Sequence, residues 1–462
     1  MDDMDRYQDV FGQLPRLNTY THLLLCFPLA KDVDRSAVVR CIQDATSELA
    51  KSFPWMSCTV KHEGKTAGNS GVFRLVPCST SHSHGMIVHV KDCSDSVAAY
   101  DRLLTDRAPV KLLDGGILAP VIAFPELYDE SKDGPAPVIL YQANFIKGGL
   151  LLDVAGQHNI IDGGGLLHSL GLLAKLMRGE QLQATELSNG DRDRRTLVQL
   201  LSPDESMLDH SHLRREPVPE LSNPVPTTAV KQPEASWCFF RFSAASISGL
   251  KSKANDDLQQ TVNGSGPSFV SSNDALCAFI WQRLAAVRLA RHGRPTDYSK
   301  FSRAMDARRA LGISKEYMGQ MGYNATCRMT FKELEDSSLG DVALVLRQAV
   351  QKVNNEYSVR SWATFIADEP DKSRIMFGGT FNPATDVGLS SLIHAGVQDT
   401  SFGILGKPDL VRRPNFRQLE SCVYLWAQTR DGDVDVLMCL QDADVQALRN
   451  DAEWAEKVDY IG

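Results

Sequence analysis

The chain of 462 residues contains no apolar run long enough to cross a membrane. Its longest apolar stretches, such as LLLCFPLA from Leu23, fall far short of the ~20 residues that a spanning helix needs. The N-terminus, MDDMDRYQDVFG, is acidic and lacks the apolar core of a secretory signal. We therefore expect a soluble, cytoplasmic protein that has no membrane partner.

Basic clusters and paired cysteine motifs are also missing. The net charge of −8 is spread along the chain, so no segment attracts a nucleic-acid backbone or an anionic membrane surface. None of the ten cysteines belongs to a CxxC pair, and most have apolar neighbours, as is typical of reduced thiols that pack as small hydrophobic side chains. These absences indicate an intracellular protein with no nucleic-acid partner.

Proline, by contrast, is concentrated in one segment. Residues 202–236 contain six prolines and have neither a helical nor a strand period, so we predict an extended crossover there. A single core rarely grows beyond ~250 to 300 residues, so a chain of this length is expected to divide. We predict an N-terminal domain at 1–201, the Pro-rich crossover at 202–236 and a C-terminal domain at 237–462.

Both predicted domains mix helices and strands, which places the chain in the α/β class. In the first, Asp34 is a candidate cap for a helix that ends at Phe53-Pro54, and VILYQANFI and LLLDVAG predict two strands joined by a turn at 147–149. In the second, WCFFRFS predicts a strand. The segment FVSSNDALCAFIWQRLAAVRLA predicts a long buried helix that begins at its serine and asparagine caps.

The stretch QHNIIDGGG at 157–165 places His158 at the end of a predicted strand and Asp162 at the start of a predicted helix. An ordinary interpretation makes Asp162 a helix cap and His158 a satisfied loop residue. Three glycines oppose it, because each costs about 1 kcal/mol in a helix relative to alanine unless backbone or ligand must approach closely. The spacing of His158 and Asp162 also permits a metal site. No third ligand of a suitable type is nearby, so we predict no metal.

The motif H-x-x-x-D-G, together with F-G-x-x-G-K-P at 402–408, resembles the BAHD acyltransferases, which move an acyl group from coenzyme A to an alcohol or amine. The chain is most similar to the fungal trichothecene 3-O-acetyltransferases of that superfamily. The similar segments run along the whole chain: FGQLPRLNTYT, NFIKGGLLLDVAGQH, ASWCFFRFS, FVSSNDALCAFIW, AMDARRALG, FGILGKPDLVRRP and LESCVYLW. The resemblance implies two chloramphenicol-acetyltransferase-like α/β domains with mixed sheets and an active-site channel at their interface.

The resemblance also implies the substrates and the site. Acetyl-CoA is the implied cosubstrate, and the implied acceptor is a small-molecule alcohol such as a polycyclic, terpenoid-like fungal secondary metabolite; we expect a monomer. His158 is the implied general base, and Ser390 is the implied donor to the oxyanion. Asp162 completes the catalytic motif by pairing with the structural residue Arg308. Eight further residues are implied to contact the substrates or the coenzyme: Gly163, Gly164, Lys251, Lys253, Ser271, Ser272, Asn273 and Ser391.

Two positions depart from the family pattern. The F-G-x-x-G segment is implied to shape the second domain through Phe402, Gly403 and Gly406. Ser401 stands where the family has an aspartate, and one extra residue precedes Gly406, which predicts altered stability or coenzyme fit rather than altered chemistry. Leu392 stands where plant relatives usually carry tryptophan, on the acceptor side of the site.

The reaction is expected to be a direct transfer. No G-x-S-x-G elbow and no activated serine or cysteine is apparent, which disfavours a covalent acyl-enzyme and favours a ternary complex. Two other functions stay open. One is an amide-forming condensation-type enzyme, whose motif H-H-x-x-x-D-G differs from this chain at Gln157. The other is a non-catalytic ligand-binding relative that keeps the fold.

Overall fold

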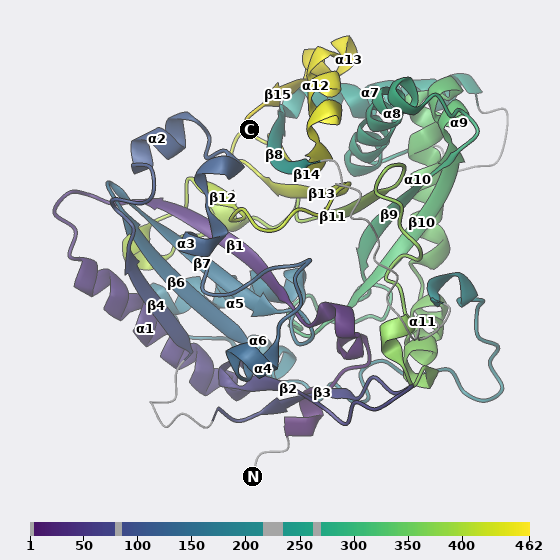
Figure 1. The fold of residues 1–462 in the computed structure, drawn as a ribbon. Coiled ribbons are helices and arrows are strands. Elements are labelled where there is room, and N and C mark those ends of the chain that lie inside the picture. The colour runs from purple at the N-terminus through teal and green to yellow at the C-terminus, as the bar shows by residue number, and fades with distance from the viewer. Residues whose placement is uncertain (1–3, 79–85, 216–233, 262–268) are drawn as a thin grey trace, which may run out of the picture.

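The computed structural model describes residues 4–78, 86–215, 234–261 and 269–462 and has an α/β fold built on three sheets (Figure 1). The five-stranded sheet has the order β12 (Leu410–Arg412), β1 (Tyr20–Pro28), β7 (Gly149–Gln157), β6 (Ile139–Ile146) and β4 (Ile87–Asp92). The seven-stranded sheet has the order β10 (Gly322–Thr330), β9 (Tyr298–Asp306), β11 (Val387–Ser391), β13 (Cys422–Gln428), β14 (Val434–Gln441), β8 (Ala235–Phe242) and β15 (Val458–Tyr460). The three-stranded sheet has the order β3 (Val72–Val76), β2 (Thr59–Glu63) and β5 (Ala136–Pro137).

The α-helices of the described ranges vary from short turns to long buried segments. They are α1 (Arg35–Ser52), α2 (Tyr100–Thr105), α3 (Gly115–Leu118), α4 (Glu130–Asp133), α5 (Gly163–Met177), α6 (Ala184–Gly190), α7 (Ala244–Thr261), α8 (Ser272–His292), α9 (Phe331–Asp336), α10 (Leu339–Val353), α11 (Glu356–Asp368), α12 (Asp442–Asn450) and α13 (Ala452–Lys457). Within those same ranges, no helix combines the length and the apolar character that crossing a bilayer requires.

Both large sheets are mixed, as predicted. In the first, β6 and β7 form an antiparallel hairpin around the predicted turn at 147–149, whereas β4 runs parallel to β6. In the second, β11 runs parallel to both β9 and β13, and the other pairs are antiparallel. A parallel neighbour needs a long connection, so the chain leaves and re-enters each sheet instead of following it strand by strand.

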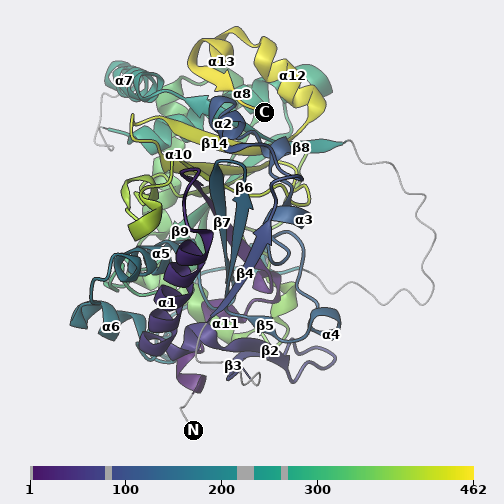
Figure 2. The ribbon, with the colours of Figure 1, turned by 90° about the vertical axis from the view of Figure 1, so that its left-hand side faces the viewer.

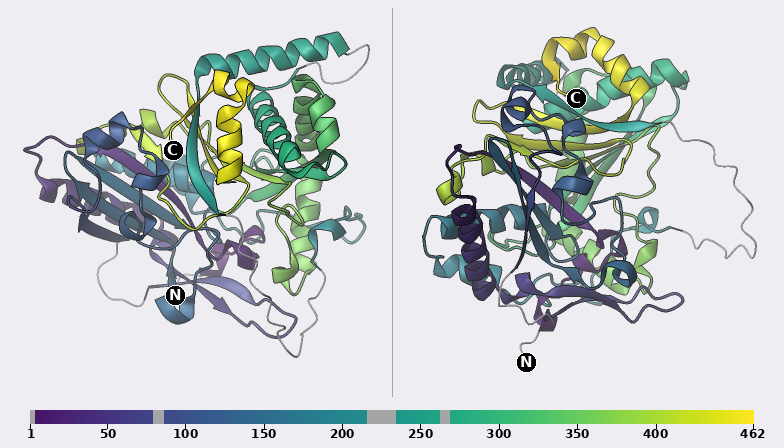
Figure 3. Two further views of the ribbon diagram at one scale, coloured as in Figure 1. Left: turned by 45° about the horizontal axis from the view of Figure 1, so that its top comes forward. Right: turned by 60° about the vertical axis from the view of Figure 1, so that its left-hand side comes forward.

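Helices cover each large sheet and bury its apolar residues. The face of α1 that carries Val38, Ile42 and Leu49 packs with α5 into the core of the five-stranded sheet. In the other half, α7, α8 and α10 pack together against the seven-stranded sheet. Figures 2 and 3 show these helices as two separate groups, with α1 and α5 beside the first sheet and α7, α8 and α10 beside the second.

The predicted starts of α1, α5 and α8 are confirmed, and so is the predicted end of α1. Asp34 caps α1 by accepting from the Ser36 backbone N–H at 2.9 Å, and the helix ends before Phe53. Ser271 caps α8. The strand β8 is present but begins at Ala235, inside the predicted crossover. Residues 216–233 of that crossover lie outside the described residues.

One expectation about the C-terminal half is wrong. The F-G-x-x-G segment packs in the core of the first sheet, not the second, because Phe402 contacts Phe27 there with ring centres 5.4 Å apart. Gly403 has a φ of 57°, and a Cβ on it would lie 2.2 Å from the Met177 carbonyl oxygen, whereas Gly406, with a φ of 68°, has open space around it. The following strand, β12, then pairs with β1. The position of a segment along the chain does not reveal which sheet it joins when the chain folds back.

Candidate active site

The candidate base, His158, begins the turn between β7 and α5. Its backbone N–H donates to the Thr19 carbonyl oxygen at 2.8 Å, which extends the pairing of β7 with β1 by one residue. The backbone N–H groups of Ile160 and Ile161 both donate to the Gln157 carbonyl oxygen, at 3.0 and 3.1 Å. His158 is partly exposed between buried neighbours. The His158 side chain is therefore partly open to solvent, whereas the residues on either side of it are buried.

The N-terminal segment packs against the buried side of this turn. Asn159 donates from Nδ2 to the carbonyl oxygens of Gly12 and Leu14, the latter at 3.1 Å. A Cβ atom on Gly12 would lie 2.0 Å from the Asn159 carbonyl oxygen, so only glycine permits this approach. The segment around Gly12 and Leu14 thus becomes part of the support for the turn.

Asp162 forms the predicted ion pair with Arg308, in a bidentate arrangement with distances of 2.8 and 2.9 Å. The same carboxylate accepts from the backbone N–H of Gly165 at 2.7 Å and from that of Met321 at 2.9 Å. Asp162 is therefore both a helix cap and an ion-pair partner. Each of its two oxygens accepts hydrogen bonds from a guanidinium N–H and a backbone N–H. Burial alone would raise the pKa of Asp162, but the Arg308 charge and the hydrogen bonds hold it below its ordinary value.

Arg308 in turn holds the segment 317–322, which leads into β10. Its Nε donates to the Tyr317 carbonyl oxygen at 2.9 Å, and its Nη2 donates to the Gly319 carbonyl oxygen at 2.8 Å. Apart from a contact of Nη1 with the more exposed Asp306, its donors point either at Asp162 or at the segment 317–322. The ion pair joins two parts of the chain that are far apart in sequence.

The three glycines after Asp162 differ in what they allow. A Cβ atom on Gly165 would lie 2.2 Å from the Met318 carbonyl oxygen, so the start of α5 and the segment 317–322 touch only because this residue has no side chain. A Cβ on Gly163 or Gly164 would meet nothing closer than 3.4 Å, with Leu392 the neighbour of Gly163. The close approach expected from the glycine run is real, but it is made by the third glycine, which the sequence did not single out.

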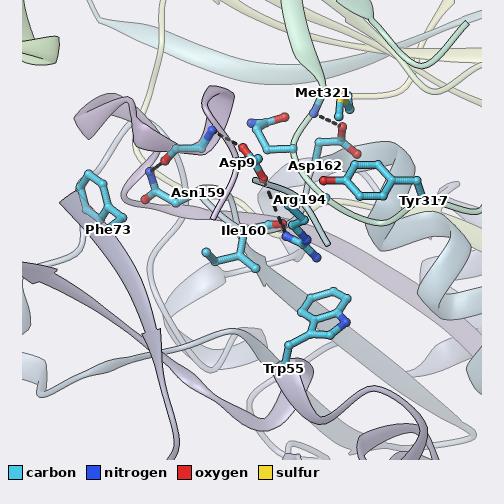
Figure 4. A network of polar contacts seen from close by, with 12 residues as sticks. Asp9, Trp55, Phe73, Asn159, Ile160, Asp162, Arg194, Tyr317 and Met321 are labelled. Carbon is cyan, nitrogen blue, oxygen red and sulfur yellow. Dashed lines mark hydrogen bonds and ion pairs between the residues drawn. The ribbon is translucent and has the colours of Figure 1, made fainter. Parts of the chain in front are cut away.

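A second buried arginine lies behind the turn (Figure 4). Arg194 donates from Nη1 to the Ile160 carbonyl oxygen at 2.8 Å, and its guanidinium carbon lies 4.5 Å from the centre of the Trp55 ring and 5.6 Å from that of Tyr317. Asp9 is its counter-ion at 3.8 Å. Burial raises the pKa of the Asp9 carboxyl to about 7, although the Arg194 charge opposes this. The turn is thus supported by a cation among aromatic rings.

The imidazole of His158 contacts one side chain that no sequence pattern marks. Gln320 places Nε2 3.1 Å from the His158 carbonyl oxygen and 3.2 Å from Nδ1, although the two residues are 162 positions apart. Burial lowers the pKa of His158 because it disfavours the charged ring, and the nearby charge of Asp162 opposes this only in part. The ring is therefore neutral near pH 7. Its Nε2 has no hydrogen-bond partner within the described part of the chain.

Ser390 and Ser391 end β11 and point to opposite faces of the seven-stranded sheet. Ser391 shares a face with Leu389, which is buried in the core beneath the helices, and its Oγ accepts from the Ile393 backbone N–H at 3.5 Å. Ser390 lies beside Tyr424 across the parallel ladder, and Tyr424 packs against the core of the first sheet. Only Ser390 therefore faces the junction between the two large sheets.

The residues predicted to contact the coenzyme lie on the helices of the second half. They are Ser271, Ser272 and Asn273 at the start of α8 and Lys251 and Lys253 on the exposed side of α7. Ser271 accepts at Oγ from the Asp274 backbone N–H at 3.2 Å, so its hydroxyl is used as a helix cap. Lys253 pairs with Asp257 at 3.5 Å. None of these contacts reaches the turn of His158, so their role stays a prediction.

Two family models match the sequence. The trichothecene 3-O-acetyltransferase-like N-terminal domain matches residues 19–176, and the Transferase family matches residues 122–455. Because the second match spans more than half of the chain, the chain belongs to this family, that of the BAHD acyltransferases. It is an acyltransferase of the O-acetyltransferase class.

Individual relatives are similar over their whole length. The chain is 44% identical over 465 residues to the O-acyltransferase pigD of Monascus ruber, with 100% of both chains covered. It is 42% identical over 463 residues to the O-acetyltransferase epaC of Aspergillus niger, which covers 100% of this chain and 98% of that one. The crystal structure of TRI101 from F. graminearum with coenzyme A and T-2 mycotoxin has a TM-score of 0.88 at 33% identity, over 98% of this chain and 99% of that chain. The predicted similarity to the trichothecene enzymes is confirmed, and pigD and epaC share higher identity with the chain.

The glycine contact can be tested within one helix. Gly165→Ala drives a Cβ atom into the Met318 carbonyl oxygen, and we expect it to destabilise the protein by about 1–3 kcal/mol or more. Gly171→Ala is the matched control, because nothing lies within 4 Å of its Cβ position. It should stabilise the protein by about 1 kcal/mol, since alanine is the better helix former. Urea unfolding measures both; equal midpoints for the two variants would contradict the close approach.

The ion pair predicts a large and pH-dependent effect. Asp162→Asn leaves Arg308 buried without its counter-ion, and we expect a loss of about 3–5 kcal/mol in the free energy of unfolding. Because the folded pKa of Asp162 is lowered, this stabilisation is present above about pH 4 and disappears as the pH falls through the lowered pKa.

The control uses the same arginine. Asp306 also accepts from Arg308, at 2.9 Å, but its side chain is 57% exposed. Asp306→Asn is therefore expected to cost at most about 1 kcal/mol. A loss as small as this for Asp162→Asn would mean that the buried pair is not the main tie between the two halves.

Proposed function

We propose that this enzyme transfers the acetyl group of acetyl-CoA to a hydroxyl of a polycyclic, terpenoid-like secondary metabolite, with His158 as the general base. One observation supports the proposal most: Nε2 of the neutral imidazole accepts no hydrogen bond from the residues that the structure describes, while the acid of the same motif is engaged by Arg308. The choice of substrates draws on the similar TRI101 of F. graminearum, which has been crystallised with coenzyme A and either T-2 mycotoxin or deoxynivalenol.

The proposed reaction needs no covalent acyl-enzyme. The acceptor hydroxyl donates to Nε2 of His158, and its oxygen attacks the thioester carbonyl carbon as the proton moves to the ring. Negative charge then collects on the former carbonyl oxygen. The tetrahedral intermediate collapses by breaking the C–S bond, and the imidazolium returns its proton to the leaving sulfur. The products are the acetyl ester and coenzyme A with a free thiol.

We assign the oxyanion to Ser390 and the coenzyme phosphates to the second half. A donor aimed at the developing charge is worth about 3–4 kcal/mol, and Ser390 is the serine of β11 on the face toward the sheet junction. Lys251, Lys253 and the start of α8 stay the proposed phosphate contacts, because cations and helix N-termini bind such groups. The proposed role of Asp162 is to hold the turn that carries His158 in place, because none of its hydrogen bonds goes to the imidazole.

Gln157 favours this function over an amide-forming condensation reaction. Its side chain is buried and donates from Nε2 to the Oδ1 atoms of Asn18 and Asn159, both at 3.0 Å. It therefore offers no second base at the position where the condensation motif has histidine. A ligand-binding relative without turnover is the other candidate, and it predicts no thiol release from acetyl-CoA with any alcohol.

His158→Ala is expected to lower kcat by ~10²–10⁴-fold, because removal of a general base typically costs that much. The measurement is release of the coenzyme A thiol with a panel of polycyclic alcohols, on protein whose unfolding midpoint matches that of the wild type. For the wild type, kcat/KM should fall on the acid side with a midpoint below pH 6.5, because the lowered pKa keeps the ring neutral to lower pH. Near-normal turnover of the alanine variant would remove His158 as the base.

The two serines of β11 predict unequal effects. Ser390→Ala should lower kcat by about 10²–10³-fold, the usual effect of losing one oxyanion donor, while leaving the KM of the acceptor little changed. Ser391→Ala should have a far smaller effect, because its side chain is on the opposite face. Steady-state kinetics of both variants decide the point, and equal losses would assign the oxyanion to another donor.

A further inference from the structure

Cationic side chains from distant segments of the chain gather beside one end of the ladder between β9 and β10. Arg328 is directly opposite Lys300 in that ladder. The Arg215 backbone N–H donates to the Arg374 carbonyl oxygen at 2.7 Å, and the turn that carries Arg16 contacts the turn that ends at Arg374. We call these five residues the basic group: Arg16, Arg215, Lys300, Arg328 and Arg374.

The basic group lacks counter-ions. The chain has a net charge of −8, yet no member forms an ion pair with a carboxylate of the described residues. The nearby acids are engaged elsewhere: Glu369 pairs with Arg214 at 2.8 Å, and Asp386 accepts from the Lys300 backbone N–H at 3.0 Å. Like charges directly opposite in a ladder, as in Lys300 and Arg328, are destabilising. A bound anion would relieve this repulsion.

The backbone around the group holds Lys300 in place. Its side chain is 3% exposed, and its ammonium donates to the carbonyl oxygens of Gly378, at 2.8 Å, and Thr380. Carbonyl oxygens stabilise the ammonium without neutralising it. Its positive charge therefore extends to the more exposed members of the group.

Arg16 connects the basic group to the catalytic turn. Three residues after it, the Thr19 carbonyl oxygen accepts from the His158 backbone N–H at 2.8 Å. Three residues span at most ~11 Å, so the Cα atom of Arg16 lies within that distance of the Cα atom of Thr19. The guanidinium of Arg16 has no hydrogen bond or ion pair within the part of the chain that the structure describes. Burial and the Arg215 charge lower its pKa, but an arginine stays charged near neutral pH.

We propose that Arg16 binds an ionised oxygen group, such as a carboxylate, on the acceptor, while the rest of the basic group supplies attractive charge. The inference rests on the proposed function and narrows its acceptor to an acidic polycyclic alcohol. A guanidinium fits a carboxylate well, because it offers two parallel N–H donors. A polycyclic skeleton is long enough to place its hydroxyl at His158 and its acidic group at Arg16.

The coenzyme phosphates have a different proposed place. Arg303 of β9 donates to Asp274, in the first turn of α8, at 2.9 Å. Because successive residues of a strand point to opposite faces, Arg303 and Lys300 lie on opposite faces of the seven-stranded sheet. The start of α8, which we propose to bind the coenzyme, is therefore across the sheet from the basic group. The acceptor is the substrate that remains for the basic group.

The test compares polycyclic hydroxy acids with their methyl esters, which keep the skeleton but lose the charge. The wild type should have a KM about 10–100-fold lower for the acids, the usual effect of hydrogen bonds to a charged group. Arg16→Gln should remove this preference by raising the KM of the acids, with a far smaller change for the esters and for acetyl-CoA. Arg16→Lys keeps the charge but loses the paired donors, so it should retain only part of the preference.

Arg449→Gln is the matched control. Arg449 is an exposed arginine of α12 that stacks on Tyr460 and has no ion pair within the described ranges. Its substitution changes the net charge by the same amount but leaves the basic group intact, so the preference for acids should stay at the wild-type value. Thermal unfolding checks that each variant is folded. If Arg16→Gln does not fold, the preference of Arg16→Lys decides the point.

Calorimetric titration of each acid and ester into the wild type and Arg16→Gln repeats the comparison without turnover. The absence of thiol release with every acceptor would reject the proposed function, whereas the affinities would still test the anion site. Equal wild-type affinities for acids and esters, or equal losses in Arg16→Gln and Arg449→Gln, would overturn the inference. A rise in the KM of acetyl-CoA alone would also overturn it, because the basic group would then bind the coenzyme phosphates.

Discussion

The buried ion pair between Asp162 and Arg308 is the constraint on which the rest of the site depends. A buried carboxylate is stable only when its oxygens accept hydrogen bonds. Here two N–H groups of the guanidinium and two backbone N–H groups donate to them. Three of those four donors come from the second half of the chain. The first turn of α5 can therefore have its native capped form only when the segment 317–322 is in place, and that segment also brings Gln320 to His158.

Buried ion pairs, and glycines that leave room for close backbone contacts, hold the same region together. Tyr317 lies close to both Arg194 and Arg308, with each guanidinium carbon 5.6 Å from its ring centre, so one aromatic ring contacts two buried cations. Gly12 and Gly165 let backbone touch backbone on either side.

The sequence predicts what depends on local pattern. The helix α1, the hairpin of β6 and β7 and the cap of α8 follow from periodicity, glycine and capping residues within a few positions of one another. The ion pair of Asp162 was accessible through resemblance, because its arginine sits in a recognisable motif. Gln320 was not, since a lone glutamine 162 positions from His158 has no local signature. The obligatory glycine was likewise hidden, because the need for it arises from a carbonyl oxygen that approaches in three dimensions.

The return of β12 to the first sheet bears on how the protein is made. Leu24 of β1 pairs with Arg412, which is 412 − 24 = 388 positions later in the chain. At ~5–20 residues per second, a ribosome needs about 20–80 seconds to supply that partner. During this time the nascent chain holds β1 with an open edge, which is the kind of surface that pairs with strands of other chains. The first sheet therefore cannot be completed until most of the chain has been synthesised.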